Sequence, residues 1–139
     1  MADGDEQPGG IQRRLLTRDG VAQANTGDLG IAEHVDDLGV PAELDLVVGE
    51  MLKACAPHSK WIDVFCDRGA FTTEQSRRIL EAGIKKGLHP RIHLNQLEQG
   101  DGVAMAIELD CASADHLTYL TDDDISALAA SNTVAGLVC

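Results

Sequence analysis

The chain has 139 residues, which suits one domain of ordinary size. Hydrophobic residues make up 44% but aromatic residues only 3%, so small and aliphatic side chains must do most of the packing. The formal net charge of -12 would repel a phosphate backbone, so we expect no nucleic-acid partner. No apolar run approaches the roughly twenty residues of a membrane helix, and the acidic N-terminus shows no secretory signal. We therefore expect a cytoplasmic protein without a membrane partner.

The cysteines show neither a disulfide framework nor a zinc motif. Cys55, Cys66, Cys111 and Cys139 are scattered, and no two of them form a C-x-x-C pair. We expect buried free thiols in a reducing compartment.

Residues 1–40 form the weakest part of the pattern. They are rich in Gly, Asp and Glu, and their apolar residues follow no sustained period. We expect a poorly ordered N-terminal lead-in with one or two helical turns at most, separate from residues 41–139. His34 falls in this lead-in, where a solvated surface histidine is commoner than a ligand.

The pattern becomes regular from Pro41 onward. Proline suits the first helical position, apolar residues then recur at helical spacing, and Pro57 bars continuation, so we predict a helix ending near Cys55. The β-branched and aromatic run 61–66 predicts a buried strand. Thr72 and Gln75 form a capping box at the start of the next helix, which ends near Lys85 and Lys86.

Strands and helices alternate through the rest of the chain. This alternation predicts a parallel α/β sheet, and the length of each unit suits part of a (β/α) TIM-type barrel, about half of one. An open doubly wound sheet is the rival, but no Gly-rich phosphate loop follows a strand. The predicted strands are 91–94, 113–116 and 133–138, the last of them buried, and the predicted helices are 102–109 and 125–130.

Two histidines lie at the carboxyl ends of predicted strands. Because the carboxyl ends of parallel strands meet on one side, His93 and His116 should project over the same face and there build a metal or catalytic site. Gln96 follows in the loop after His93, where its amide can hydrogen-bond a substrate. Asp115 should face away from His116 and make a hydrogen bond or a helix contact behind the sheet. On spacing alone, satisfied polar histidines are commoner than ligands.

Several stretches between about Ala42 and Val138 together follow the pattern of one known family. They are 61–71 (Trp-Ile-Asp-Val-Phe-Cys-Asp-Arg-Gly-Ala-Phe), 74–77, 80–83, 93–97 (His-Leu-Asn-Gln-Leu), 106–109, 112–116 (Ala-Ser-Ala-Asp-His) and 119–120. In these stretches the sequence resembles imidazolonepropionase, a metal-dependent member of the amidohydrolase superfamily. The resemblance covers about a quarter of a full-length family member, so we expect an internal fragment from the middle of its barrel.

The resemblance implies roles for three residues. His93 matches a histidine that ligates the single divalent metal, zinc or iron. His116 matches a histidine placed to act on the bound water or the substrate, and Gln96 matches a position close to the substrate ring. The implied reaction is hydrolysis of 4-imidazolone-5-propanoate to N-formimidoyl-L-glutamate in histidine degradation, with that small molecule as substrate.

The sequence also departs from the family at the other expected metal ligands. The family carries a His-x-His pair and a late aspartate as further metal ligands, and the sequence contains no His-x-His. The ligand set is therefore expected to be incomplete, and the chain alone inactive. The alternative is a small non-enzymatic α/β domain that self-associates as a homo-oligomer or serves as an interaction module.

Overall fold

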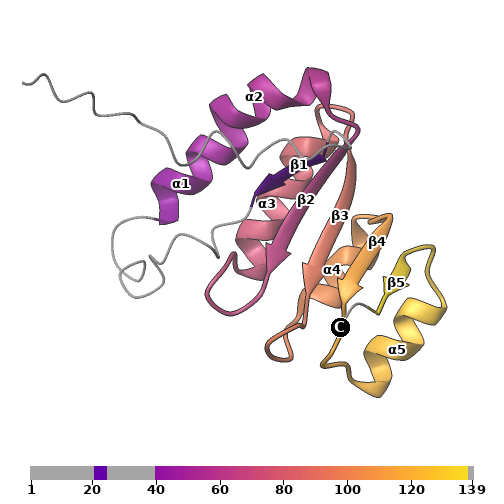
Figure 1. Cartoon of the computed structure of the whole chain (residues 1–139). Coiled ribbons are helices and arrows are strands. Elements are labelled where there is room, and N and C mark those ends of the chain that lie inside the picture. Colours follow the sequence, from indigo (N-terminus) through magenta and orange to yellow (C-terminus); the bar gives the residue numbers. More distant parts are fainter. Residues whose placement is uncertain (1–20, 25–39, 138–139) are drawn as a thin grey trace, which may run out of the picture.

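The computed structural model describes residues 21–24 and 40–137 of the chain. Their strands form one sheet with the order β1-β2-β3-β4-β5, and every neighbouring pair is parallel. The strands therefore follow one another across the sheet in chain order, as they do in a (β/α) barrel (Figure 1). They are β1 (Val21–Ala24), β2 (Trp61–Cys66), β3 (His89–Leu94), β4 (Ser113–His116) and β5 (Val134–Gly136).

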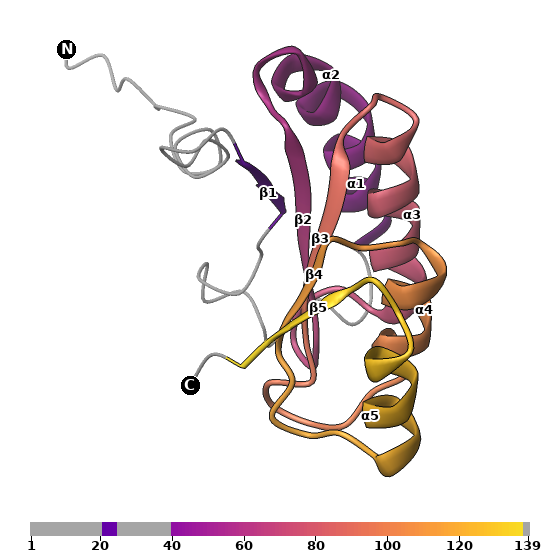
Figure 2. The same cartoon turned by 90° about the vertical axis from the view of Figure 1, so that its right-hand side faces the viewer.

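The helices of the described residues lie on one side of this sheet (Figure 2). In a complete barrel the helices likewise form a ring on one side of the strands. The predicted fold class, parallel α/β in the form of part of a barrel, is confirmed. The helices are α1 (Val40–Leu46), α2 (Leu52–Cys55), α3 (Thr73–Ile84), α4 (Gly102–Glu108) and α5 (Asp122–Ala129).

The first helical stretch is longer and less regular than predicted. A π-helical segment, Val47–Met51, joins α1 to α2, and a 3-10 turn, Ala56–His58, follows α2. Pro57 lies inside that turn, where its missing N–H and fixed φ end the α-helical hydrogen bonding. The predicted end near Cys55 is confirmed.

Helix α3 begins as its sequence predicts. The Thr72 hydroxyl accepts a hydrogen bond from the backbone N–H of Gln75, and the Gln75 side chain accepts one from the backbone of Thr72. Gly83 faces β2 so closely that a Cβ there would meet the Ile62 side chain at 2.5 Å. The helix and the strand are thus in direct contact, and Ile62 faces the helices.

Alternation along the strands gives the sheet two different faces. The face toward the helices is apolar and buried, with Ile62, Val64, Cys66, Ile92, Leu94 and Ala114 in the core. We call the opposite side the polar face, because its strand residues are mostly polar or aromatic. It carries Trp61, Asp63, Phe65, Arg91, His93, Ser113 and Asp115.

Two predictions about strands need correction. Strand β1 was not predicted, yet it pairs with β2 from Val21↔Trp61 to Ala24↔Val64. Strand β5 was predicted to be buried, but Val134 is 63% exposed. Among the described strands it is the last of the sheet and has a neighbour on one side only. The remaining residues of the expected lead-in, with His34, lie outside the described residues, and the division at residue 40 stays a prediction.

The cysteines within the described residues are free thiols. Cys66 and Cys111 are buried and Cys55 is partly buried, while Cys139 lies outside the described range. Burial raises the pKa of the Cys111 thiol to about 12, and the Asp110 carboxylate acts in the same direction. Among the described helices, none has the length and apolar character needed to cross a membrane.

Candidate functional site

The two histidines singled out by their strand-end positions lie next to each other. His93 is the fifth residue of β3 and His116 closes β4, and these strands pair in parallel. The ring centroids are 5.3 Å apart, with an angle of 49° between the ring planes. The expected meeting of the rings at the carboxyl end of the sheet is therefore observed, while their chemical roles stay predictions.

His93 forms a hydrogen bond with a buried carboxylate that was not predicted from the sequence to belong to the site. Asp63 lies in the middle of β2 and is 3% exposed. Its Oδ2 atom lies 3.0 Å from Nε2 of His93. This hydrogen bond raises the pKa of His93, since it favours the protonated ring; burial opposes the shift, and the charges of Asp63 and Asp115 add to it. One signal was available in the sequence: an acidic residue inside an otherwise apolar strand.

Two buried polar atoms in this part of the sheet have no hydrogen-bond partner among the described residues. They are Oδ1 of Asp63 and Nδ1 of His116. Buried polar atoms are paired in the great majority of cases, and exceptions concentrate where a ligand, a water or a catalytic function requires them. The unpaired atoms mark the surroundings of His93 and His116 as a candidate functional site.

Asp115 lies on a different face from the one predicted. It is the register partner of His93 and so lies on the polar face, where its carboxylate accepts a hydrogen bond of 3.0 Å from the Ser113 hydroxyl. The prediction assumed regular strand alternation through His116. The backbone instead turns left-handed there, with φ of 77° at His116 and 55° at Leu117, so alternation does not fix the direction of the His116 ring.

Gln96 lies in the loop after β3 with an exposed side chain. Within residues 43–137, no hydrogen bond joins it to either histidine. The loop is anchored through its backbone, because Oδ2 of Asp67 accepts hydrogen bonds from the N–H groups of Gln96 (2.7 Å) and Leu97 (3.0 Å). The two loops that follow β2 and β3 are thereby fastened to each other.

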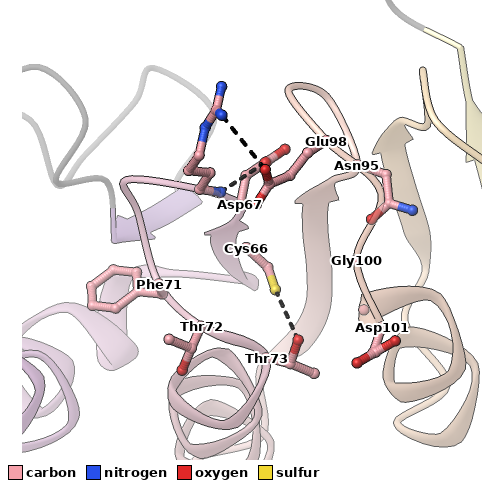
Figure 3. A pocket seen from close by; sticks show the side chains of 11 residues that line it. Cys66, Asp67, Phe71, Thr72, Thr73, Asn95, Glu98, Gly100 and Asp101 are labelled. Atoms are coloured by element: carbon pink, nitrogen blue, oxygen red, sulfur yellow. Dashed lines mark hydrogen bonds and ion pairs between the residues drawn. The ribbon is translucent and has the colours of Figure 1, made fainter.

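A cavity of about 270 Å³ lies between these two loops (Figure 3). Cys66 borders it from the end of β2, and its Sγ atom lies 3.9 Å from the Thr73 hydroxyl. Burial raises the pKa of the Cys66 thiol, which keeps it protonated and unreactive. Asn95 closes the far side and donates a hydrogen bond of 2.8 Å to the Tyr119 carbonyl, which ties the loops after β3 and β4 together.

The described residues do not by themselves fit a catalytic metal. Across residues 21–24 and 40–137, no three His, Cys, Asp or Glu side chains come together as a metal-binding group. His93 is a single imidazole whose Nε2 is engaged by Asp63. Catalytic zinc sites use three protein ligands, so we derive no reaction step through a metal.

The chain was compared with protein families, with curated proteins and with solved structures. No family model matches the chain. Curated imidazolonepropionases do: that of Streptomyces coelicolor is 65% identical over 97 residues, covering 70% of this chain and 25% of the relative. Those of Streptomyces avermitilis and Mycolicibacterium smegmatis are 63% and 60% identical over 106 and 107 residues, 76% and 77% of this chain. The chain spans about a quarter of the length of these relatives.

A solved structure supports the fold. A Xaa-Pro dipeptidase with methionine bound in its active site superposes with a TM-score of 0.52 at 17% identity. The match covers 70% of this chain and 25% of that one. The chain is therefore similar to imidazolonepropionases, at 60–65% identity over at least 70% of its own length and about a quarter of theirs.

Proposed function

We propose that the chain carries part of the active site of an imidazolonepropionase. The proposed reaction is hydrolysis of 4-imidazolone-5-propanoate to N-formimidoyl-L-glutamate, a step of histidine degradation in the cytoplasm. One observation carries the proposal: His93 and His116, which lie in the stretches 93–97 and 112–116 that resemble the family, meet with ring centroids 5.3 Å apart at the carboxyl end of the sheet. Strand carboxyl ends are where barrel enzymes place their catalytic residues.

Each site residue has a proposed part in ring opening. Water adds to the ring carbonyl, the ring C–N bond breaks, and the departing nitrogen takes up a proton. His116 is proposed as the group that accepts the proton of the attacking water, because imidazole is suited to proton transfer near neutral pH. Gln96, exposed in the loop after β3, is proposed to hydrogen-bond the substrate, and its loop is held in place by Asp67.

The proposed enzyme also requires a divalent metal. The resemblance implies zinc or iron, with His93 as one ligand. Because the described residues offer no group of three ligands, we expect the 139-residue chain alone to show no turnover. Turnover by the chain alone at the rate of the Streptomyces coelicolor relative would contradict this expectation.

The activity can be tested in a chimera. The 97 aligned residues of this chain replace the corresponding segment of the Streptomyces coelicolor protein, and hydrolysis of the imidazolone ring is followed with the unmodified relative as reference. We expect the chimera to turn over, and His116→Ala in it to lower kcat by about 10²- to 10⁴-fold, the usual contribution of a positioned acid or base.

A matched surface change serves as the control for that chimera. Arg78 lies in α3, on the helix side of the sheet, and forms an exposed ion pair with Asp45, with 2.6 Å between the charged atoms. Arg78→Ala is expected to leave kcat unchanged. A folded chimera without turnover, or equal activity with and without the His116 imidazole, would contradict the proposed function.

A second candidate, self-association, is favoured by the exposed edge of the sheet. Val134 in β5 and Leu137 just after it are 63% and 76% exposed, and the described helices leave the polar face uncovered. Unpaired sheet edges with apolar side chains favour pairing with another chain. Sedimentation over a range of concentrations tests this candidate: a homo-oligomer is expected, and a monomer throughout would contradict it.

A further inference from the structure

We propose that Asn95 is a positioning residue: it joins the loop that carries Gln96 to the loop that follows His116, so that these two residues keep a fixed relative position. The inference deepens the proposed function and rests on it for its bearing on turnover. Its structural content, two hydrogen bonds between neighbouring loops, can be measured without any turnover.

Asn95 begins the loop after β3 and is bonded twice to one residue of the loop after β4. Its side-chain nitrogen donates to the Tyr119 carbonyl at 2.8 Å, and its own carbonyl accepts from the Tyr119 backbone N–H at 3.0 Å. We call these two hydrogen bonds the Asn95–Tyr119 link. They continue the contact between the two strands beyond their last register partners, Leu94 and His116.

Asparagine suits this position for two reasons. The backbone is left-handed there, with φ of 52°, a conformation that asparagine adopts more readily than most residues other than glycine. Asn95 is also only 2% exposed, and a buried amide is costly unless it is hydrogen-bonded. Because a carbonyl oxygen can only accept, the Asn95 nitrogen must be the atom that faces Tyr119. The Asn95–Tyr119 link thus satisfies the buried amide in the turn that the backbone makes.

The other side of the same loop is fixed by a separate contact. Asp67, in the loop after β2, accepts hydrogen bonds from the backbone N–H groups of Gln96 and Leu97. The backbone of Gln96 is therefore held from both sides, although its side chain is exposed. The contact through Asp67 leads toward β2, whereas the contact through Asn95 leads toward β4 and His116.

This arrangement makes Gln96 and His116 parts of one unit in the proposed reaction. Gln96 is proposed to hydrogen-bond the substrate, and His116 to accept the proton of the attacking water. The two groups act together only when substrate and water are held in reacting geometry, and a misplacement of about 1 Å can cost about 10²-fold in rate. Asn95 itself touches neither reactant in this scheme and acts through Gln96.

NMR of the isotope-labelled full chain tests the Asn95–Tyr119 link directly. We expect a coupling across the hydrogen bond from Nδ2 of Asn95 to the carbonyl carbon of Tyr119. The side-chain amide protons of Asn95 should also exchange with solvent more slowly than those of Asn132, which is exposed. Equal exchange rates for the two side chains would overturn the inference. This measurement needs no variant and therefore does not depend on how substitutions affect folding.

Two matched variants sharpen the structural test. Asn95→Gly removes the amide, and glycine adopts a positive φ without strain. Gln96→Ala removes the neighbouring exposed side chain and leaves the Asn95–Tyr119 link in place. We expect the Tyr119 backbone proton to exchange faster in the first variant and to stay protected in the second, with circular dichroism confirming that both are folded. A Tyr119 proton still protected in folded Asn95→Gly would contradict the inference.

A double-mutant cycle in the chimera tests the role in turnover. Asn95→Gly is expected to lower kcat/KM by up to about 10²-fold. Because Asn95 acts through Gln96, the loss caused by Gln96→Ala should be smaller when Asn95→Gly is already present, whereas the losses of independent residues multiply. A general loss of stability would leave the effect of Gln96→Ala the same in both backgrounds. Losses that multiply in folded chimeras would therefore contradict the positioning role.

Failure of the inference and failure of the proposed function can be told apart. If the Asn95 side chain exchanges as fast as that of Asn132 while the chimera hydrolyses its substrate, the inference fails and the function stands. If the Asn95–Tyr119 link is present while the folded chimera is inactive, the proposed function fails, and the positioning role in turnover fails with it.

Discussion

The two faces of the sheet divide stability from chemistry. Toward the helices, alternate strand residues such as Ile62, Val64 and Ile92 are buried apolar side chains. On the polar face, one residue further along each strand, lie Asp63 and His93 with their hydrogen bond. The same strands therefore contribute to the core through one set of residues and to the candidate site through the other.

Because the two faces carry different residues, a short segment can keep the residues of a site in position. The core residues fix the position of each strand, and the strands fix the polar residues relative to one another within about one side-chain length. A substitution on the helix side should therefore unfold the segment, and one on the polar face should alter its chemistry.

The largest effect is expected from the centre of the helix-covered face. Ile92 is 0% exposed, so Ile92→Ala removes buried methyl and methylene groups and leaves a cavity, at a cost of about 2–5 kcal/mol in the free energy of unfolding. Val134→Ala, at the exposed edge, should change it by less than about 0.5 kcal/mol. Denaturant titration measures both values, and equal costs would contradict the division between a stabilising face and a chemical face.

The contact between helix and sheet gives a second, smaller effect. In Gly83→Ala the new methyl group would collide with Ile62, and crowding a packed core costs about 1–3 kcal/mol. Gly49→Ala is the matched control, because the space around Gly49 is open and alanine favours a helix by up to about 1 kcal/mol. Destabilisation by the first variant alone is expected in thermal unfolding; a stabilising Gly83→Ala would contradict the observed packing.

The polar face should make the free energy of unfolding depend on pH. Asp63 raises the pKa of His93 in the folded state above its ordinary value of about 6.5. The stabilisation from the charged pair is then complete below pH ~6.5 and is lost as the pH rises through the raised pKa. Unfolding followed from pH 5.5 to 8.5 should show this decline, and Asp63→Ala should flatten it. An unchanged slope in that variant would show that His93 is not coupled to Asp63.

The smallest effect is expected at the outer surface of the helices. Arg77 of α3 donates to both carboxylate oxygens of Glu108, at 3.1 and 2.6 Å, which raises the pKa of Arg77 and lowers that of Glu108. Both side chains face solvent, where such pairs contribute little and salt weakens them. Arg77→Ala should shift the unfolding midpoint less than Ile92→Ala or Gly83→Ala does, and a loss comparable to that of Ile92→Ala would contradict this ranking.

The sequence predicted the elements whose signals are local. The strand 61–66, the capping box of Thr72 and Gln75, and the strand 113–116 were all found where expected, because each depends on residues within a few positions. The meeting of His93 and His116 was also predictable, since it follows from parallel strands with a common carboxyl end.

The remaining features depend on contacts between distant residues. Strand β1 has only four residues, which are too few to show a hydrophobic period in the sequence. It pairs with β2, which begins far along the chain at Trp61. The bond from Asp63 to His93 joins residues 30 positions apart. The exposure of β5 depends on its place at the edge of the sheet, and the left-handed backbone at His116 is uncommon for a residue other than glycine.

The distance between the two imidazoles is the most direct test of the account. Nuclear Overhauser contacts between the ring protons of His93 and His116 can be measured in the full chain with labelled histidines. With centroids 5.3 Å apart, cross-peaks between the two rings are expected. A folded chain in which each ring contacts only residues of the helix-covered core would contradict the account.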